Sequence, residues 1–111
     1  MSDWSTPLAA FLAGVEASAD RAHVGQRHGT MRVLLYSPRD VDRQTPHRQD
    51  ELYIIQSGSG LLRKGDEAIA FGPGDVLFVE AHADHRFESF TQDFAAWAVF
   101  WGPEGGEGWT A

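Results

Sequence analysis

The sequence predicts an all-β fold with one short helix near its N-terminus. From Thr30 onward, apolar runs of strand length alternate with turns rich in glycine and proline, a pattern typical of a sandwich or barrel. Only the first residues place apolar side chains at helical spacing. Several of the strand-like runs are apolar on both faces, so we expect both faces of the sheets to be covered.

A short amphipathic helix is expected to begin at Pro7 and to end within 14–18. Ser5 or Thr6 can cap it, and proline suits the first helical position. Four apolar residues fall on one helical stripe: Leu8, Phe11, Leu12 and Val15. Residues 19–29 have no clear period. We therefore assign residues 1–29 to a helix that covers the core or a dimer contact, followed by a connecting segment.

Residues 30–101 are predicted to form the β domain. The expected strands span 31–36, 52–56, 61–63, 68–71, 76–79, 85–90 and 94–101. Residues 64–67 have the composition of a hairpin turn. After Gly102 the glycine-rich composition cannot hold a strand, so residues 102–111 are expected to be a loose tail.

The amino-acid composition limits the kinds of partner and cofactor that the chain could bind. The chain has 111 residues, enough for one domain with one core, and a formal net charge of -7, which argues against nucleic acid. No cysteine is present, so a metal would need nitrogen and oxygen ligands. No apolar run approaches the ~20 residues of a membrane span, and the N-terminus does not resemble a secretory signal. We expect a cytoplasmic protein with no membrane partner.

A histidine and a carboxylate stand four residues apart where the second predicted strand begins. In an extended strand, even spacing sends His47 and Glu51 to the same face, together with Gln49, Tyr53 and Ile55. Burying such polar groups beside an apolar strand is costly unless they are compensated. A bound metal ion would compensate them, and so would a simple pairing of His47 with Glu51.

A second cluster begins at Gly74, continues through an apolar strand and a polar loop, and ends at His85. Together the two clusters resemble the two sequence motifs of the cupin superfamily. Five positions of this chain match those motifs: His47, Glu51, Gly58, Gly74 and His85. Five depart from them: Arg39 and His82 replace glycines, Thr45 a histidine, Glu80 a proline and Ser89 an asparagine. The resemblance covers about 31–101.

The resemblance implies a double-stranded β-helix, or jelly-roll barrel, and a homodimer. It also implies one divalent transition metal bound by His47, Glu51 and His85. Two imidazoles and a carboxylate are typical of a non-haem iron site with open positions, and they also suit zinc, manganese, nickel or copper. Thr45, His82 or water could take the place of the missing histidine. Alternatively, His85 could be a core histidine bonded to a carbonyl.

Two functions follow from this resemblance. The chain could be an enzyme, an oxygenase, isomerase or hydrolase acting on a small substrate that chelates the metal through oxygen. It could instead be a non-catalytic module that binds or senses a metal or a small molecule. In the enzyme, Tyr53 is the candidate general acid or base, although a metal-bound water could serve instead. Residues that could contact the substrate are Thr45, Gln49, Tyr53 and Phe87, although Tyr53 and Phe87 could equally be core aromatics. Asp50 and Arg86 have the opposite parity, and we expect them to face solvent or an interface.

Overall fold

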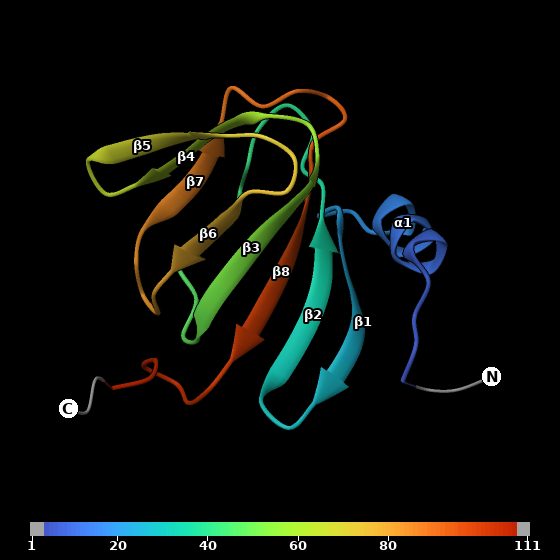
Figure 1. Ribbon diagram of the computed structural model, residues 1–111, viewed down its shortest axis with the longest axis horizontal. Coiled ribbons are helices and arrows are strands. Elements are labelled where there is room, and N and C mark those ends of the chain that lie inside the picture. Colours follow the sequence, from blue (N-terminus) through green and yellow to red (C-terminus); the bar gives the residue numbers. More distant parts are fainter. Residues whose placement is uncertain (1–3, 109–111) are drawn as a thin grey trace.

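The computed structural model describes residues 4–108 as one helix and eight strands (Figure 1). The elements are α1 (Leu8–Ala17), β1 (Ala22–His28), β2 (Met31–Tyr36), β3 (Asp50–Ser57), β4 (Gly60–Lys64), β5 (Glu67–Phe71), β6 (Val76–Val79), β7 (His85–Glu88) and β8 (Ala95–Trp101). The predicted all-β fold with a short N-terminal helix is therefore confirmed.

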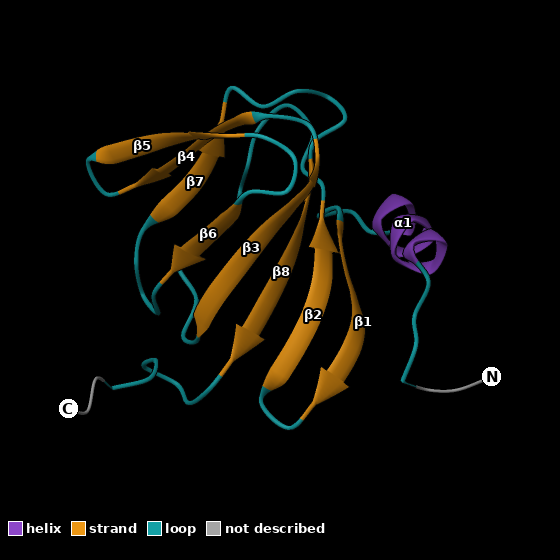
Figure 2. Ribbon diagram, viewed as in Figure 1, coloured by secondary structure: helices purple, strands orange, loops and turns teal. Residues whose placement is uncertain are grey.

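The strands form two antiparallel sheets that lie over one another (Figure 2). The larger sheet has the order β1-β2-β8-β3-β6, and the smaller one has the order β5-β4-β7. β4 and β5 form the expected hairpin, whose turn contains Gly65 at φ +60°. After β3 the chain passes repeatedly between the sheets. Residues far apart in the sequence, such as those of β3 and β7, therefore meet in the space between them.

The main core fills that space with aromatic side chains. Phe87 of β7 packs against Phe71 of β5 and against Phe94, with ring centroids 5.5 and 4.7 Å apart. Tyr53 of β3 contacts the same ring at 4.8 Å. Aromatic rings at these separations bury large apolar areas and restrict one another's orientation. The core thus fixes the side of β3 and β7 from which the polar cluster described below projects.

Helix α1 packs on the outer face of the larger sheet. Phe11 and Val15 are buried against Leu35 of β2 and Ala95 of β8. Leu8 and Leu12 lie on the expected stripe but are 39% and 43% exposed. The contact requires a glycine in β1, because a Cβ at Gly25 would lie 2.4 Å from the Phe11 ring. The helix therefore covers only part of the outer apolar face.

Three details at the ends of the chain differ from the sequence-based expectations. Residues 22–28, predicted to be a connecting segment, form β1, whose alternation is broken by an irregularity between Val24 and Gln26. Within the described part of the chain no side chain caps α1, since the Thr6 hydroxyl donates to the carbonyl of Gly25 instead. The tail is not loose up to Glu107, whose backbone N–H donates to the Asp50 carboxylate at 2.9 Å. The prediction for residues 109–111 lies outside the described residues.

Part of the outer sheet face carries exposed apolar side chains. Val76 and Phe78 of β6 are 59% and 48% exposed, and Phe78 packs against Trp101 at the end of β8. These strands are apolar on both faces, as the sequence predicts, and α1 lies over β1 and β2 instead. The predicted homodimer stays a prediction. Among residues 4–108, no helix is both long enough and apolar enough to cross a membrane.

Candidate metal centre

Three polar side chains converge between the two sheets. His47 lies three residues before β3, Glu51 is the second residue of β3, and His85 is the first residue of β7. Glu51 Oε1 lies 2.8 Å from His47 Nε2 and 3.5 Å from His85 Nε2. One ligand atom from each residue lies within 4.8 Å of the others. The geometry thus brings together the three residues that the family resemblance implies as metal ligands.

Backbone carbonyls set the orientation of both imidazoles. Nδ1 of His47 lies 2.7 Å from the carbonyl oxygen of Gln49, and Nδ1 of His85 lies 2.8 Å from that of Ala83. Because a carbonyl oxygen can only accept, the hydrogen of each neutral ring must be on Nδ1. Both Nε2 atoms therefore direct a lone pair toward Glu51. This arrangement, in which an outer partner fixes the tautomer, is typical of histidines that bind metals.

In the part of the chain that the structure describes, two of the three facing atoms lack a hydrogen-bond partner. Glu51 and His85 are buried, with 2% and 3% of their surfaces exposed. Among the described residues, His47 Nε2 and Glu51 Oε1 have no hydrogen-bond partner, although the two atoms are only 2.8 Å apart. Such buried acceptors require a shared cation, either a proton or a metal ion. An N2O donor set of this kind fits a divalent transition metal.

The charges within the cluster shift two pKa values. Burial tends to raise the pKa of Glu51, but the imidazoles of His47 and His85, which can take up a proton beside the carboxylate, outweigh it, and the pKa lies below its ordinary value. Burial tends to lower the pKa of His85, but the Glu51 carboxylate and the Ala83 carbonyl outweigh it, so this pKa is raised. Glu51 is therefore ionised at neutral pH. In metal-free protein, a proton on His85 can partly replace a metal ion.

Tyr53 supports His85 from the buried side. The Gln44 amide donates to the Asp42 carboxylate at 2.6 Å, so its carbonyl oxygen accepts from the Tyr53 hydroxyl at 3.0 Å. The Tyr53 oxygen lies 3.3 Å from His85 Nε2. Burial, followed by the charge of Glu51, raises the pKa of Tyr53 well above its ordinary value. The hydroxyl therefore remains protonated at neutral pH, with its hydrogen donated to Gln44.

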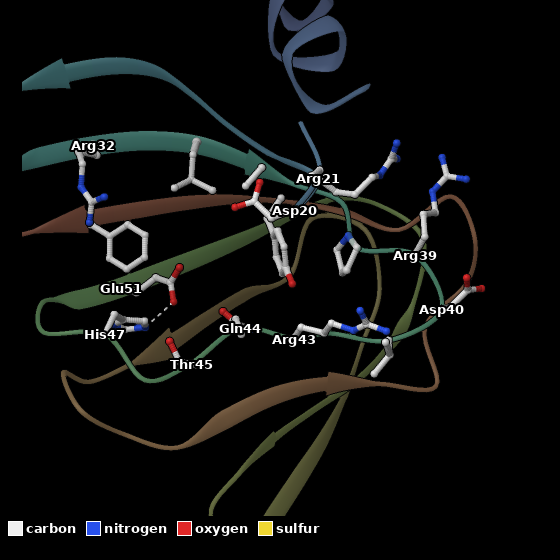
Figure 3. Close-up of a pocket in the computed structure, with 17 residues that line it drawn as sticks. Asp20, Arg21, Arg32, Arg39, Asp40, Arg43, Gln44, Thr45, His47 and Glu51 are labelled. Carbon is white, nitrogen blue, oxygen red and sulfur yellow. Dashed lines mark ion pairs between the residues drawn. The ribbon is translucent and has the colours of Figure 1, made fainter. Parts of the chain in front are cut away.

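A cavity of about 980 Å³ opens beside the cluster (Figure 3). His47 and Glu51 lie at one end of the view, with Thr45 beside them. The ring of Phe100 contacts His47, with centroids 4.8 Å apart, and also lines the cavity. A substrate in this cavity would meet His47 and Glu51 where they line its wall. Of the four residues predicted to contact substrate, Thr45 is the one that lines it.

The other predicted contact residues lie elsewhere. Gln49 points away from the cluster, because its amide donates to the carbonyls of Thr30 and Gly102 in a second, smaller hollow. Phe87 and Tyr53 are core residues that do not line the cavity. Contact between substrate and these three side chains therefore stays a prediction, because none of them lines the cavity.

Two further expectations concern neighbouring polar residues. Asp50 was expected to face solvent or an interface, but it is buried, and it accepts hydrogen bonds from the backbone of Ala81 and Glu107. Asp50 therefore joins the loop before β7 to the C-terminal segment. His82 is exposed, with φ +67°, and its backbone N–H donates to the carbonyl of His47 at 2.7 Å. Its backbone therefore supports His47, and its ring is not part of the cluster.

Asp42 is an important residue that the sequence did not reveal. This fully buried carboxylate accepts hydrogen bonds from the Tyr36 hydroxyl, from the backbone and amide of Gln44, and from the backbone of Phe87 in β7. It thereby fastens segment 37–49, which carries His47, to the smaller sheet. The segment is polar and aperiodic, so no sequence pattern distinguishes this aspartate from its exposed neighbour Asp40.

Two facing antiparallel sheets with a buried His-His-Glu cluster between them define a β-sandwich protein with a candidate metal site. The chain belongs to the cupin family, since residues 32–101 match the model of the cupin domain. The fold and the family resemblance predicted from the sequence are thus confirmed. An uncharacterised protein of Streptomyces coelicolor is 35% identical over 80 residues, which is 70% of this chain and 76% of that protein.

Solved structures share the fold. A cupin 2 conserved barrel domain protein of Salinispora arenicola is 20% identical, with a TM-score of 0.62 over 74% of this chain and 75% of that one. The DMSP lyase DddQ of Ruegeria pomeroyi is 18% identical, with a TM-score of 0.63 over 73% of this chain and 46% of that one. At these identities the likeness extends to the fold and carries no activity over to this chain.

Proposed function

We propose that this chain is a metal-dependent enzyme that holds one divalent transition metal through His47, Glu51 and His85. The observation that carries the proposal is the cluster of buried acceptor atoms that face one another. Within it, His47 Nε2 and Glu51 Oε1 have no hydrogen-bond partner among the residues described. Iron is the metal we favour, because two histidines and one carboxylate form the donor set of non-haem iron sites. Zinc, manganese, nickel and copper are the alternatives for the same donors.

The residues of the chain have separable tasks in this proposal. The carbonyls of Gln49 and Ala83 keep the imidazoles in the binding tautomer, and Glu51 contributes the negative charge. When bound, the metal would supply Lewis-acid or redox chemistry for oxygenation, isomerisation or hydrolysis. Three protein ligands leave positions for a substrate that chelates through oxygen. The cavity beside His47 has the volume of a typical small-molecule site.

A non-catalytic binding or sensing module is the second candidate. One observation favours it: Tyr53, the predicted general acid or base, is fully buried and does not line the cavity. Apart from the cluster, the acidic groups that line the cavity are Asp20 and Asp40. An enzyme of this design would therefore rely on metal-bound water for proton transfer. Turnover of a chelating substrate separates the two candidates.

Elemental analysis of the native protein tests the metal centre. We expect about one equivalent of a transition metal, which is lost in His47→Ala and in His85→Ala while circular dichroism shows both variants folded. His28→Ala is the matched control, because His28 is exposed on β1 and lies outside the cluster. Full metal content in either cluster variant would remove that residue from the site. Oxygen consumption or product formation with diketone or catechol substrates then tests catalysis.

Two further elements of the proposal concern the cellular form of the protein. The exposed apolar side chains of β6 support a homodimer, since a second copy would cover them. The lack of cysteine is compatible with a cytoplasmic location. The acidic net charge supports a small-molecule ligand and neither nucleic acid nor a membrane as a partner.

A further inference from the structure

Arginines are concentrated along the cavity in an otherwise acidic chain. Among the residues that the structure describes, four basic and three acidic residues line it, in a chain that has nine basic and sixteen acidic residues. The four are Arg21, Arg32, Arg39 and Arg43. The rest of the molecule therefore carries a large excess of negative charge, and the cavity does not share it. A local concentration of guanidinium groups on such a background attracts small anions.

Two of these arginines are held by the protein itself. Arg21 donates to the Ser37 carbonyl at 2.9 Å and pairs with Glu16 at 3.1 Å. Arg32 lies over the Phe100 ring, 4.5 Å from its centroid, and donates to the Gln49 side chain at 3.1 Å. Their guanidinium groups are already engaged, so both serve mainly to shape the walls of the cavity.

Arg39 and Arg43 are different. Both are exposed, and among residues 4–108 neither side chain makes an ion pair or a hydrogen bond, although Asp40 lies between them in the sequence. Figure 3 shows Arg39 and Asp40 at the end of the view opposite to His47 and Glu51, and Arg43 between that end and Gln44. Two guanidinium groups without a carboxylate partner at the edge of a cavity are ready to bind an oxyanion.

The backbone that carries these two arginines is anchored. Asp42 lies between them in the sequence and is fastened to β7 through the backbone N–H of Phe87 at 2.8 Å. The N–H of Val41 also donates to the carbonyl of Arg39 at 2.6 Å, forming a tight turn. A segment anchored in this way loses less entropy when it binds a ligand than a mobile loop would. The main chain that carries Arg39 and Arg43 is therefore held in place beside the cavity.

We propose that Arg39 and Arg43 form an anion subsite for a small organic acid whose other end reaches His47 and Glu51. The substrate class is then an organic anion with an oxyanion group, such as a carboxylate, held by the two guanidinium groups. A second set of oxygen atoms at the opposite end of the same molecule lies at the candidate metal centre. This second part rests on the proposed function, whereas the anion subsite does not.

Calorimetric titration of metal-free protein with succinate tests the subsite. Because the guanidinium groups are exposed and screened, we expect Arg39→Gln/Arg43→Gln to raise the dissociation constant about tenfold at low salt. Arg27→Gln/Arg86→Gln is the matched control, since it removes the same charge from exposed residues outside the cavity. The control should change the constant less than about twofold. Equal effects of the two double variants, or no effect of either, would overturn the subsite.

A second titration separates this inference from the proposed function. Malate adds a chelating hydroxyl to the succinate skeleton, so metal-loaded protein should bind malate more tightly than metal-free protein, while succinate should change less. The Arg39→Gln/Arg43→Gln variant should keep its full metal content. If metal is absent but succinate still depends on the two arginines, the metal centre fails and the anion subsite stands. If malate gains nothing from metal in a loaded protein, the assignment of the two ends is wrong.

Discussion

Replacing Asp42 by asparagine tests how segment 37–49 is fastened. The carboxylate accepts two hydrogen bonds on each oxygen: from the Tyr36 hydroxyl and the Gln44 backbone on one, and from the Gln44 amide and the Phe87 backbone on the other. Asparagine keeps only one oxygen. Its amide group must then face one of the two pairs of donors.

The better orientation places the new amide group toward Tyr36 and the Gln44 backbone. Burial and the hydrogen bond to Asp42 raise the pKa of Tyr36 far above its ordinary range, so the hydroxyl stays protonated, and in the variant it can turn to accept. One backbone N–H, that of Gln44, then loses its partner, and the remaining bonds lose their charged acceptor. At about 1–3 kcal/mol for an unsatisfied or weakened buried bond, the loss should be about 2 kcal/mol.

Urea unfolding of metal-free protein, monitored by tryptophan fluorescence, measures this difference without metal stabilisation. Asp40→Asn is the control, because Asp40 is exposed and asparagine tolerates its φ of +65°, so its change should stay within about 0.5 kcal/mol. Metal content should survive in both variants, since Asp42 makes no hydrogen bond to any of the three cluster residues. Equal free energies of unfolding for the two variants would contradict the expectation. They would show that the cost of burying the Asp42 charge equals the stabilisation from its hydrogen bonds.

Three further outcomes are expected. Glu51→Gln should lower metal affinity more than about a hundredfold, measured by competition with a chelator, because it removes a direct ligand. Substituting a residue that only hydrogen-bonds to a ligand already costs about 10–100-fold. Affinity within about tenfold of native would contradict this ligand assignment. Metal-free protein should be most stable between pH of about 4.5 and 6.5. The lowered pKa of Glu51 stabilises the folded state at pH values above the ordinary pKa of a glutamate, and this contribution is lost as the pH falls. The raised pKa of His85 stabilises the folded state at pH values below the ordinary pKa of a histidine, and this contribution is lost as the pH rises. The melting-temperature gain on adding metal should therefore grow above pH 6.5, and a gain that shrinks with pH would be inconsistent with histidine ligands. Phe78→Lys should shift the sedimentation of a homodimer to that of a monomer, with Ser59→Lys as an exposed control, and a monomeric native protein would exclude the dimer.

Strand parity predicted one part of the site well. Within β3, Glu51, Tyr53 and Ile55 do share the buried face, because this segment is extended and paired on both sides. Parity failed at Gln49, which precedes β3, where the chain is not extended. His85 could not be joined to Glu51 by any local pattern, since the two residues meet only through the passage between sheets, and the family resemblance supplied that pairing.

Other features have no signature in a single sequence. Strand β1 was missed because Gly25 and the irregularity after Val24 interrupt the alternation that identifies a strand. Of the arginines of the cavity, Arg21 directly precedes β1, Arg32 is in β2, and two lie in the loop after β2, so their convergence depends on the tertiary fold. Charge counting over the whole chain gave a net value of -7 and concealed this local reversal.

The main-chain support of the two histidines has a consequence for tracing the site among related proteins. The carbonyl groups of Gln49 and Ala83 exist whatever side chains those positions carry, so substitutions there can accumulate without disturbing the imidazoles. Insertions or deletions between position 47 and 49, or between 83 and 85, would displace a carbonyl and release a ring. Relatives that retain the chemistry should therefore be recognised by conserved spacing around each histidine, while the identity of the intervening residues drifts.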